Sequence, residues 1–588
     1  MSAKRWVIAP PAPANLLGQY AGMSSFLAQA LYNRGLADPA SARHFLESAD
    51  PSAGRLLDYR RRPAVDKAIM RIRQAIRSGE LIIVYGDFDA DGVTSTVLLV
   101  QVLAALGAHV APYIPHRVDE GYGLNGAALR KLARGGARLV ITVDCGIRSV
   151  EDVEEGRACG LDIIITDHHS IGPELPSAYA VINPKLDDCP YTEAMLAGVG
   201  VAYRLAEALL AVDRQMRRSP GIPLDPECLL DLVAIGTVAD LAPLNRPENR
   251  ALVRRGLEVI NEAQRPGVRA LIEVANMKTG ELSASSIGYG LGPRINAAGR
   301  LESAMLAYDL LTATDYDRAL RLAQQLHDLN VQRQELTRAA QALIRQRLEA
   351  DDQAGAPLIF AKDRAFKPGI VGLVAGRLAE EYYRPAIVLE EGDTESRASC
   401  RSIPGFDITR ALDQCADLLV RHGGHAQAAG FTVANENIEA LHRRLLAIAE
   451  AALSEYDLLP TVEIDVEVPA QSISLELAEE LALLEPTGHH NPPPVFITRG
   501  LRVVEARAVG KEGQHLKLKL VGEDGETHTA VDAIGFHMAE QMPNAGEIVD
   551  LVYQLEVNAW NGSRAPQLHL EDLQPVRMPA INLSSGKL

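Results

Sequence analysis

In the first third of the chain, three short apolar runs alternate with two longer stretches of helical periodicity. The runs are "LIIVYGD" (81–87), "RLVITVD" (138–144) and "LDIIITDHH" (161–169), and none of them has a polar face. Strands of this kind are buried on both sides, which is typical of a parallel sheet. The stretches at 93–108 and 149–160 predict the connecting helices. The segment therefore predicts an α/β fold in which helices cover both faces of a parallel sheet.

The rest of the chain predicts further domains, because 588 residues are too many for a single hydrophobic core. Residues 195 to about 310 predict mostly helix, and 316–350 predict one long charged helix that suits a rigid connector between two lobes. A second α/β pattern runs from 357 to about 450. Beyond Pro460, short alternating runs such as "HLKLKLV" (515–521) predict a small β-barrel of the OB-fold type.

Near the start of the chain, residues 23–48 predict two short amphipathic helices around a Gly-Leu-Ala-Asp-Pro turn. Such a pair occurs in DNA-binding helix-turn-helix motifs and in simple packing modules. We favour the packing module.

Charge and cysteine content exclude some classes of protein. The formal net charge of −17 argues against a nucleic-acid partner unless arginines are concentrated locally in a groove. The six cysteines include no CxxC pair, which argues against a disulfide framework and a zinc ribbon. We find no secretory leader and no apolar run long enough to cross a bilayer, and therefore expect a soluble cytoplasmic protein without a membrane partner.

Acidic and histidine side chains follow the three predicted strands where each strand ends. Asp87, Asp89 and Asp91 follow the first strand, Asp144 the second, and Asp167-His168-His169 the third. Because the carboxyl ends of parallel strands meet at one edge of the sheet, we expect these groups to converge. Their mutual repulsion would become attraction around divalent ions, and an oxygen-rich set favours Mg²⁺ or Mn²⁺ over Zn²⁺.

Each motif taken alone has a simpler interpretation. A DxDxDG run also occurs in calcium loops and polar turns, and an aspartate after a strand is frequently a helix N-cap. The occurrence of such groups at three successive strand ends favours metal chemistry.

Four motifs resemble those of the DHH phosphoesterases. They are "DFDADG" (87–92), "VDCG" (143–146), "TDHH" (166–169) and "VAIGTVADLAPL" (233–244). Within that superfamily, the chain from about residue 20 to 575 is most similar to the RecJ single-strand-specific exonucleases. Five further segments support this resemblance: "PHRVDEGYGLN" (115–125), "GPRINAAGRL" (292–301), "RSIPGFD" (401–407), "GGHAQAAG" (423–430) and "HHNPPPVF" (489–496).

The resemblance implies six segments. They are an N-terminal helical segment (1–60), a DHH catalytic domain (61–315), a connecting helix (316–352), a DHH-associated domain (353–455), an OB-fold (456–577) and a C-terminal tail (578–588).

The resemblance also implies a two-metal hydrolase that degrades single-stranded DNA in the 5′→3′ direction and releases 5′-mononucleotides during recombinational and mismatch repair. The matching metal ligands are Asp87, Asp89, Asp144, His168 and Asp240. Asp91 matches a residue that orients the ligands, and His169 matches one that contacts the scissile phosphate. Two Mn²⁺ or Mg²⁺ ions roughly 3.5–4 Å apart would activate a bridging water and clamp the reacting oxygens.

Further residues are predicted to hold the DNA strand. Arg117 could bind a phosphate, and Tyr122 could stack on a base, although the alternative for this segment is a structural loop with a buried tyrosine. Ser399 and Arg401 match positions near the 5′-terminal phosphate.

Two glycine-containing segments supply more candidates. Arg294 and Arg300 lie beside glycines that allow a close approach of backbone. We expect "GGHAQAAG" to turn from a strand into a helix, with His425 and nearby amides holding phosphate; the alternative is tight helix packing by its glycines and alanines.

Two departures from the family pattern stand out. Phe366-Lys367-Pro368-Gly369 replaces a Trp-His pair before the glycine; Phe366 could keep a stacking surface and Lys367 a positive charge. Thr487 replaces an aromatic residue, which predicts weaker OB-fold contacts to the strand.

Two other functions remain open from the sequence. One is a different DHH phosphoesterase, such as an oligoribonuclease or pyrophosphatase. The other is a DNA-binding scaffold without catalysis, although no expected ligand is missing. From the family we also expect a monomer that meets single-strand-binding protein and a repair helicase.

Overall fold

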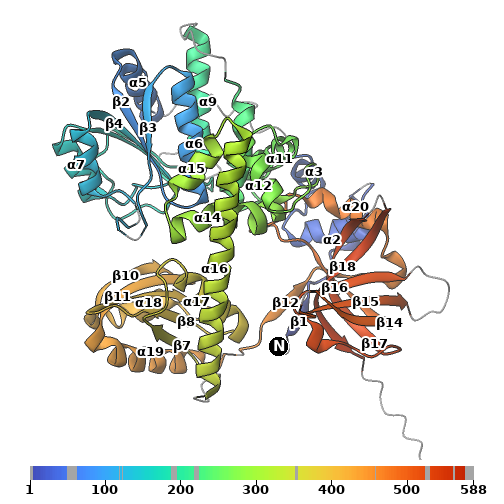
Figure 1. The fold of residues 1–588 in the computed structure, drawn as a ribbon. Coiled ribbons are helices and arrows are strands. Elements are labelled where there is room, and N and C mark those ends of the chain that lie inside the picture. Colours follow the sequence, from blue (N-terminus) through green and yellow to red (C-terminus); the bar gives the residue numbers. More distant parts are fainter. Residues whose placement is uncertain are drawn as a thin grey trace, which may run out of the picture. The chain divides into compact units, whose positions relative to one another are not determined.

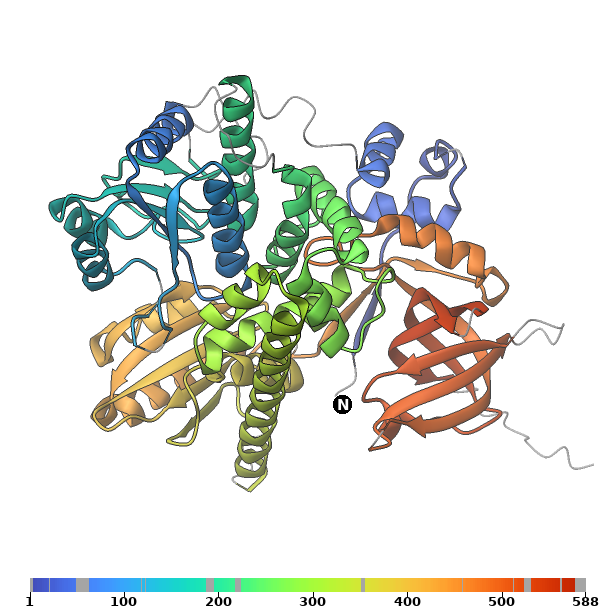
Figure 2. The same cartoon turned by 45° about the horizontal axis from the view of Figure 1, so that its top comes forward.

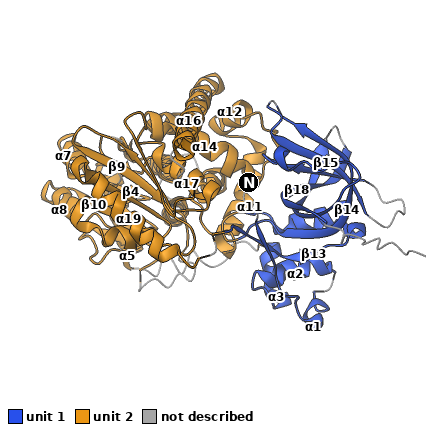
Figure 3. Cartoon of the chain, turned by 90° about the horizontal axis from the view of Figure 1, so that it is seen from below, with its two compact units in different colours: residues 1–47, 459–487, 491–588 blue, residues 48–458, 488–490 orange. Residues whose placement is uncertain are grey.

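The computed structural model describes most of the chain. The described residues are 4–20, 22–48, 63–117, 119–121, 123–186, 195–216, 224–350, 355–456, 458–510, 512–522, 530–560 and 563–576. They form two compact units (Figure 3). Unit 1 comprises residues 1–47, 459–487 and 491–588, and unit 2 comprises 48–458 and 488–490. The predicted Tyr122 and the tail 578–588 lie outside the described residues.

Unit 2 begins with a five-stranded parallel sheet of order β3-β2-β4-β5-β6. Its strands are β2 (Leu81–Tyr85), β3 (His109–Tyr113), β4 (Ala137–Val143), β5 (Asp162–Thr166) and β6 (Ala180–Ile182). The chain moves from β2 to the edge strand β3 and returns to β4 on the other side of β2. This reversal lies between β2 and β4, where α/β sheets open a crevice at the carboxyl ends of their strands.

Both faces of this sheet are covered, as predicted (Figure 1). Alternate strand residues such as Val84 and Ile141 join a core with the helices α5 (Pro63–Ser78), α6 (Ala90–Ala105) and α9 (Gly198–Met216). Their neighbours, such as Ile83 and Val140, face α7 (Gly126–Arg134) and α8 (Val150–Ala158). Burial on both sides explains why these strands lack a polar face.

A largely helical region follows, and the long connecting helix is confirmed. The region contains α10 (Leu230–Ala239), α11 (Pro247–Glu262), α12 (Pro266–Val274), α13 (Ala284–Ser286), the π-helical turn η2 (Ile287–Leu291), α14 (Gly292–Leu301) and α15 (Met305–Thr312). Helix α16 then runs from Tyr316 to Ala350. Ala323 and Leu326 pack into the core of the first lobe, whereas Ile344 and Leu348 pack into that of the second.

The second lobe of unit 2 has a mixed sheet of order β10-β11-β9-β8-β7. Its strands are β7 (Ile359–Asp363), β8 (Ala386–Glu390), β9 (Glu395–Arg401), β10 (Leu419–His425) and β11 (Ala428–Ala434). Helix α17 (Val371–Tyr382) packs with β7 and β8 in one core, and α18 (Ile408–Asp413) and α19 (Ile438–Leu453) belong to the core on the opposite face.

The expected strand-to-helix turn in "GGHAQAAG" is wrong. Gly423, Gly424 and His425 end β10, and a short hairpin returns the chain into β11. The physical reason is that β11 pairs with both β10 and β9, while Phe431 and Val433 alternate into the core. This ladder outweighs the helical preference of the alanines.

Unit 1 contains a six-stranded sheet closed by pairing of β14 with β17, which confirms the predicted barrel (Figure 2). Its strands are β13 (Val466–Glu467), β14 (Val495–Val509), β15 (His515–Gly522), β16 (Val531–Gly535), β17 (Ile548–Trp560) and β18 (Ser563–Pro575). The barrel core also includes residues of α20 (Leu475–Leu481).

The N-terminal helices belong to this same unit. The two predicted helices are α2 (Ser25–Asn33) and α3 (Pro39–Glu47), and Leu27, Leu31 and Phe45 are buried in the barrel core. The short α1 (Ala14–Leu17) precedes them, and β1 (Arg5–Ile8), which was not predicted, pairs with β12 (Thr461–Ile464). The two units thus divide the chain differently from the six predicted segments, whose bounds stay predictions. None of the described helices could span a membrane.

Candidate active site

The three aspartates after β2 have different surroundings. Asp89 is the N-cap of α6, and its Oδ1 accepts a hydrogen bond from the Gly92 amide at 3.0 Å. Asp91 lies in the first turn of α6 and is 1% exposed. Both of its oxygens are occupied, because they accept from the amides of Gly198 (2.6 Å) and Val199 (2.8 Å) at the start of α9. These bonds tie Asp91 to backbone, in line with its predicted orienting role.

Asp144 follows β4 in a strained conformation. Its backbone φ is +61°, a left-handed geometry that costs free energy for a residue with a side chain, and it is 2% exposed. Gly198 makes this position possible, since a Cβ on that glycine would lie 2.6 Å from Cβ of Asp144.

Asp167 holds the histidine pair in place. Its Oδ1 accepts from the backbone amides of His168 (2.7 Å) and His169 (3.0 Å), and its Oδ2 accepts from the Ile147 amide (2.9 Å). The Nδ1 of His169 lies 2.8 Å from the same Oδ1. Asp167 therefore positions both imidazoles, a role that was not predicted for it.

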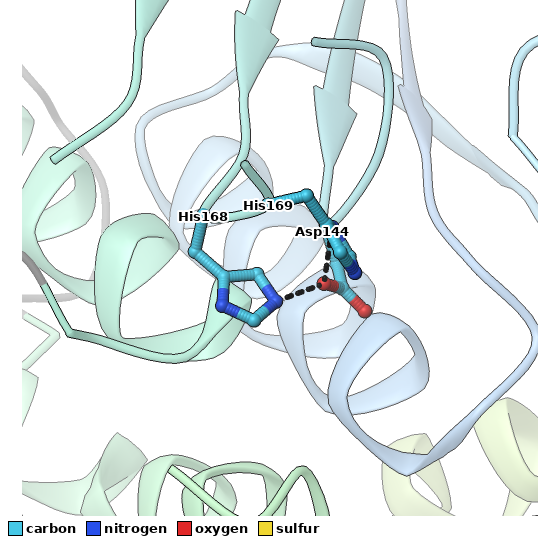
Figure 4. A group of neighbouring side chains, drawn as sticks. All are labelled: Asp144, His168 and His169. Carbon is cyan, nitrogen blue, oxygen red and sulfur yellow. Dashed lines mark ion pairs between the residues drawn. The ribbon is translucent and has the colours of Figure 1, made fainter. Parts of the chain in front are cut away.

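The ends of β4 and β5 bring Asp144, His168 and His169 together (Figure 4). The Nε2 of His168 lies 3.0 Å from Oδ1 of Asp144, 3.7 Å from Oδ2 of Asp240 and 3.9 Å from Oδ2 of Asp91. Asp240 is the C-cap of α10. Three overlapping groups have ligand atoms within 4.8 Å of one another: Asp144-His168-His169, Asp91-His168-Asp240 and Asp87-Asp89-Asp144.

Three buried donor atoms in this cluster suit a divalent cation. Oδ1 of Asp87, Oδ1 of Asp144 and Nε2 of His168 make no hydrogen bond with a described residue, and the last two atoms face each other at 3.0 Å. A buried polar atom without a partner costs about 1–3 kcal/mol, and three such atoms on neighbouring strand ends are unusual in a native protein. Carboxylate oxygens with one imidazole nitrogen fit Mg²⁺ or Mn²⁺.

The acids of the cluster repel one another in the absence of a cation. Burial is the largest cause that raises the pKa of Asp87 and of Asp144 well above the usual range, and the charges of Asp89 and Asp91 add to it. Burial and the charge of Asp91 raise the pKa of Asp240 to about 9. Burial and Asp89 raise the pKa of Asp91 to about 7. A divalent cation would reverse these shifts, because it favours the ionised carboxylates.

The two histidines differ in protonation. Burial and the neighbouring His169 lower the pKa of His168 to about 3, so this imidazole is neutral and offers a lone pair to a metal. Burial also acts to lower the pKa of His169, but the hydrogen bond and charge of Asp167 outweigh it and the net shift is upward. The ring of His169 therefore binds a proton more readily than an ordinary histidine.

A basic pocket of about 240 Å³ is formed by residues of both lobes of unit 2. Four predicted strand-binding residues line it: Arg117, Arg300, Ser399 and Arg401. Arg397 and Glu390 line it too, and neither was predicted. Gly372 allows the close packing of its wall, because a Cβ there would lie 2.9 Å from Oγ of Ser399. The negative overall charge thus coexists with a local concentration of arginines.

The arginines of this pocket repel one another and adjoin the acidic cluster. Burial lowers the pKa of Arg300 to about 10, and the charges of Arg117 and Arg401 contribute. Burial also lowers the pKa of Arg117, against which the charges of Asp87 and Asp89 act. Arg117 also lies over the ring of Phe88. The pocket and the acidic cluster are therefore electrostatically coupled.

Other predicted residues lie outside this pocket. Arg294 donates to the carbonyl of Gly290 (2.8 Å) and to Nδ1 of His327 (3.3 Å). His425 is exposed at the end of β10. Phe366 is 4% exposed within the core of the second lobe, so the idea that it offers a stacking surface is wrong. Thr487 donates to Glu485 at 3.1 Å, and its effect on DNA contacts stays a prediction.

Comparisons with known proteins agree with this arrangement. Family models match the chain as "DHH family, N-terminal domain" (81–237), "DHHA1 domain" (355–454) and "RecJ OB domain" (464–572). The chain is 37% identical to the single-stranded-DNA-specific exonuclease RecJ of Bacillus subtilis over 97% of its own length and 71% of that protein. It is 35% identical to RecJ of Escherichia coli over 89% of its own length and 92% of that protein. The chain belongs to the RecJ family of single-stranded-DNA-specific exonucleases.

A solved RecJ structure shares the fold. The crystal structure of Thermus thermophilus RecJ with Mn²⁺ has a TM-score of 0.80 at 32% identity, covering 98% of this chain and 80% of that one. The crystal structure of RecJ from the same organism with Mg²⁺ has a TM-score of 0.72 at 31% identity. The match covers 98% of this chain and 78% of that one. The predicted architecture of two α/β lobes, a long helix and an OB-fold is thereby confirmed.

Two residues of the basic pocket, Arg397 and Glu390, were not predicted although the sequence held a signal for them. Arg397 precedes Ser399 and Arg401 at intervals of two in β9, and such residues share one face of a strand. Glu390 pairs with Arg397 across β8 and β9. A strand assignment at 395–401 would have placed all three β9 side chains together.

Proposed function

We propose that this RecJ-family chain is an exonuclease that hydrolyses single-stranded DNA from the 5′ end and releases 5′-mononucleotides. The observation that carries the proposal is the set of buried ligand atoms on Asp87, Asp144 and His168 that make no hydrogen bond, together with an arginine-lined pocket. Residues that would hold two Mn²⁺ or Mg²⁺ ions are Asp87, Asp89, Asp144, His168 and Asp240. Ions bound there supply a Lewis acid that makes water nucleophilic at neutral pH and offsets phosphate charge.

Asp91 orients the acidic side chains that would hold the ions, and His169 would stabilise the scissile phosphate. Asp91 holds the entry to α6 against the amides of α9, which fixes the direction of the neighbouring acids. His169, held by Asp167, is placed to donate a proton or a hydrogen bond to an oxygen of the scissile phosphate. Because its pKa is raised, His169 suits the role of a donor better than that of a base.

The basic pocket supports the proposed polarity. Its guanidinium groups and the Ser399 hydroxyl match the charge and hydrogen-bonding needs of a terminal phosphate. The charges of Asp87 and Asp89 act on Arg117, which supports a position for such a phosphate beside the acidic cluster. A 5′-phosphate bound in this pocket would present the first phosphodiester for cleavage.

The test compares 5′- and 3′-end-labelled single-stranded DNA and duplex DNA, with Mn²⁺ and with EDTA. We expect Mn²⁺-dependent release of labelled mononucleotide from the 5′ end of single strands only. Asp89→Ala and His168→Ala should abolish it without loss of fold, while Asp393→Ala, at a carboxylate 95% exposed, should match the wild type. Full activity in either site variant would refute the site, and digestion from the 3′ end would refute the polarity.

The biological setting rests on the family alone. A role in recombinational and mismatch repair, contact with single-strand-binding protein and a repair helicase, a monomeric state and a cytoplasmic location stay predictions.

A further inference from the structure

Tyr289 is the most exposed of the large hydrophobic side chains in the described part of the chain. It is 87% exposed and lies between two glycines in the π-helical turn η2, which leads directly into α14. A single exposed aromatic is not unusual. The significance of Tyr289 comes from its place at the start of the continuous η2–α14 segment.

One face of the η2–α14 segment follows the acidic cluster. Asn296 accepts from the amide of Ala90 at 2.9 Å, and Gly299 packs on the carbonyl of Phe88, both within the segment that carries Asp87 and Asp89. Further back, a Cβ on Gly292 would lie 3.3 Å from Ala239, the last residue of α10 before Asp240. A Cβ on Gly288 would lie 3.8 Å from Val238.

The two ends of the same segment carry different groups. Arg300 lines the basic pocket and donates to the carbonyl of Gly369 at 3.1 Å. Each residue turns about the helix axis by about 100° in α14 and by less in the π turn. Tyr289, Pro293 and Arg300 therefore fall on one stripe of the helix surface roughly 35° wide. The rise per residue separates Tyr289 from Arg300 by about 15 Å along the axis. Between them lie the contacts to Phe88, Ala90 and Ala239, which are chain neighbours of Asp87, Asp89 and Asp240.

We propose that Tyr289 is a stacking platform for a base on the 3′ side of the scissile phosphate. The inference rests on the proposed function. If the pocket at Arg300 takes the 5′-phosphate and the acidic cluster takes the reacting phosphate, the strand leaves past Asp240 toward Tyr289. A tyrosine ring there binds any base by its π-face, which suits an enzyme that must hold every sequence. Tyr289 is thus a positioning residue that grips the polymer without touching the reacting atoms.

The test uses substrates of two lengths. A 5′-phosphorylated dinucleotide ends before it reaches Tyr289, whereas a longer oligothymidylate passes it. We expect Tyr289→Ala to raise KM for the oligonucleotide by about tenfold, as loss of one stacked base predicts. Its kcat and its kinetics on the dinucleotide should stay at the wild-type values. Tyr289→Trp should retain the wild-type KM, and Met70→Ala, at another exposed apolar side chain, should have no effect.

An abasic scan separates stacking from a structural role. In the wild type, removal of a single base beyond the second nucleotide, at the position that stacks on Tyr289, should raise KM, and in Tyr289→Ala removal of that same base should have no further effect. Equal losses on both substrate lengths, an unchanged KM for the oligonucleotide, or additive effects of the variant and the abasic site would each overturn the inference. If the wild type degrades neither substrate with Mn²⁺, the proposed function itself fails.

Discussion

The substitution Asp240→Asn should stabilise the metal-free protein while it removes a ligand. The asparagine keeps the shape of the side chain but carries no titratable group. In the metal-free fold the pKa of Asp240 is raised from 3.8 to about 9 by burial and by neighbouring carboxylates, of which Asp91 and Asp89 act most strongly. At pH 7 the folded protein therefore holds a proton that the unfolded chain has released, and this uptake opposes folding.

The size of this stabilisation follows from the interval between 3.8, the pKa of Asp240 in the unfolded chain, and the pH of the assay. Each pH unit costs 1.36 kcal/mol, so the cost at pH 7 approaches about 4 kcal/mol for Asp240. Other carboxyls of the cluster share this cost. We therefore expect Asp240→Asn to raise the free energy of unfolding by about 2–4 kcal/mol. For a unit that spans residues 48–458, this raises Tm by roughly 1 °C per kcal/mol.

The assay is thermal unfolding of wild type and Asp240→Asn in EDTA and in saturating Mg²⁺, with Asp393→Asn as the control. We expect the variant to melt a few degrees higher in EDTA and to gain less than the wild type from Mg²⁺. A lower Tm of the variant in EDTA, or an equal gain from Mg²⁺ in both proteins, would show that the acids do not repel one another around a cation site.

Three further predictions concern the same centre. Raising the pH from about 4 to 9 should lower the Tm of the metal-free protein, because the raised pKa values of Asp91 and Asp240 favour the protonated fold at low pH; calorimetry in EDTA should show this fall, and a flat profile would contradict it. Arg401→Ala should raise KM for 5′-phosphorylated DNA by roughly 10- to 100-fold, and far less for 5′-hydroxyl DNA; equal effects on both substrates would remove the phosphate from this pocket. Gly198→Ala should cost about 1–3 kcal/mol of stability and weaken Mn²⁺ binding, since its methyl group would displace Asp144; calorimetric titration checks the affinity, and a wild-type value would refute the proposed crowding.

Much of the fold could be predicted because buried strands and helices have recognisable patterns of apolar residues in the sequence. The strands that contribute Ile83, Val140 and Ile164 are covered on both faces, so they contain no polar alternation and predict a parallel sheet. Helix α16 was equally clear as a long segment without breakers. The hairpin at His425 could not be predicted in this way. Its second strand, β11, is held by pairing with β9, which is distant in the sequence and leaves no local signal.

From the residues themselves, the site could be predicted only as acidic and histidine side chains at strand ends; the choice of individual ligands came from the resemblance to the DHH phosphoesterases. Sequence alone places Asp144, Asp167 and His168 at strand ends, but it does not distinguish a ligand from a support. Only the fold shows that Asp167 accepts hydrogen bonds from three amides, while Asp144 Oδ1 and His168 Nε2 make no hydrogen bond and face each other at 3.0 Å.

The most direct measurement of the central claim is anomalous X-ray diffraction at the manganese edge from crystals soaked in Mn²⁺. We expect two peaks among the carboxylates and imidazole of Asp87, Asp89, Asp144, His168 and Asp240. Manganese bound elsewhere, with no peak among these side chains, would contradict the claim that the strand ends of the first sheet form the catalytic metal centre.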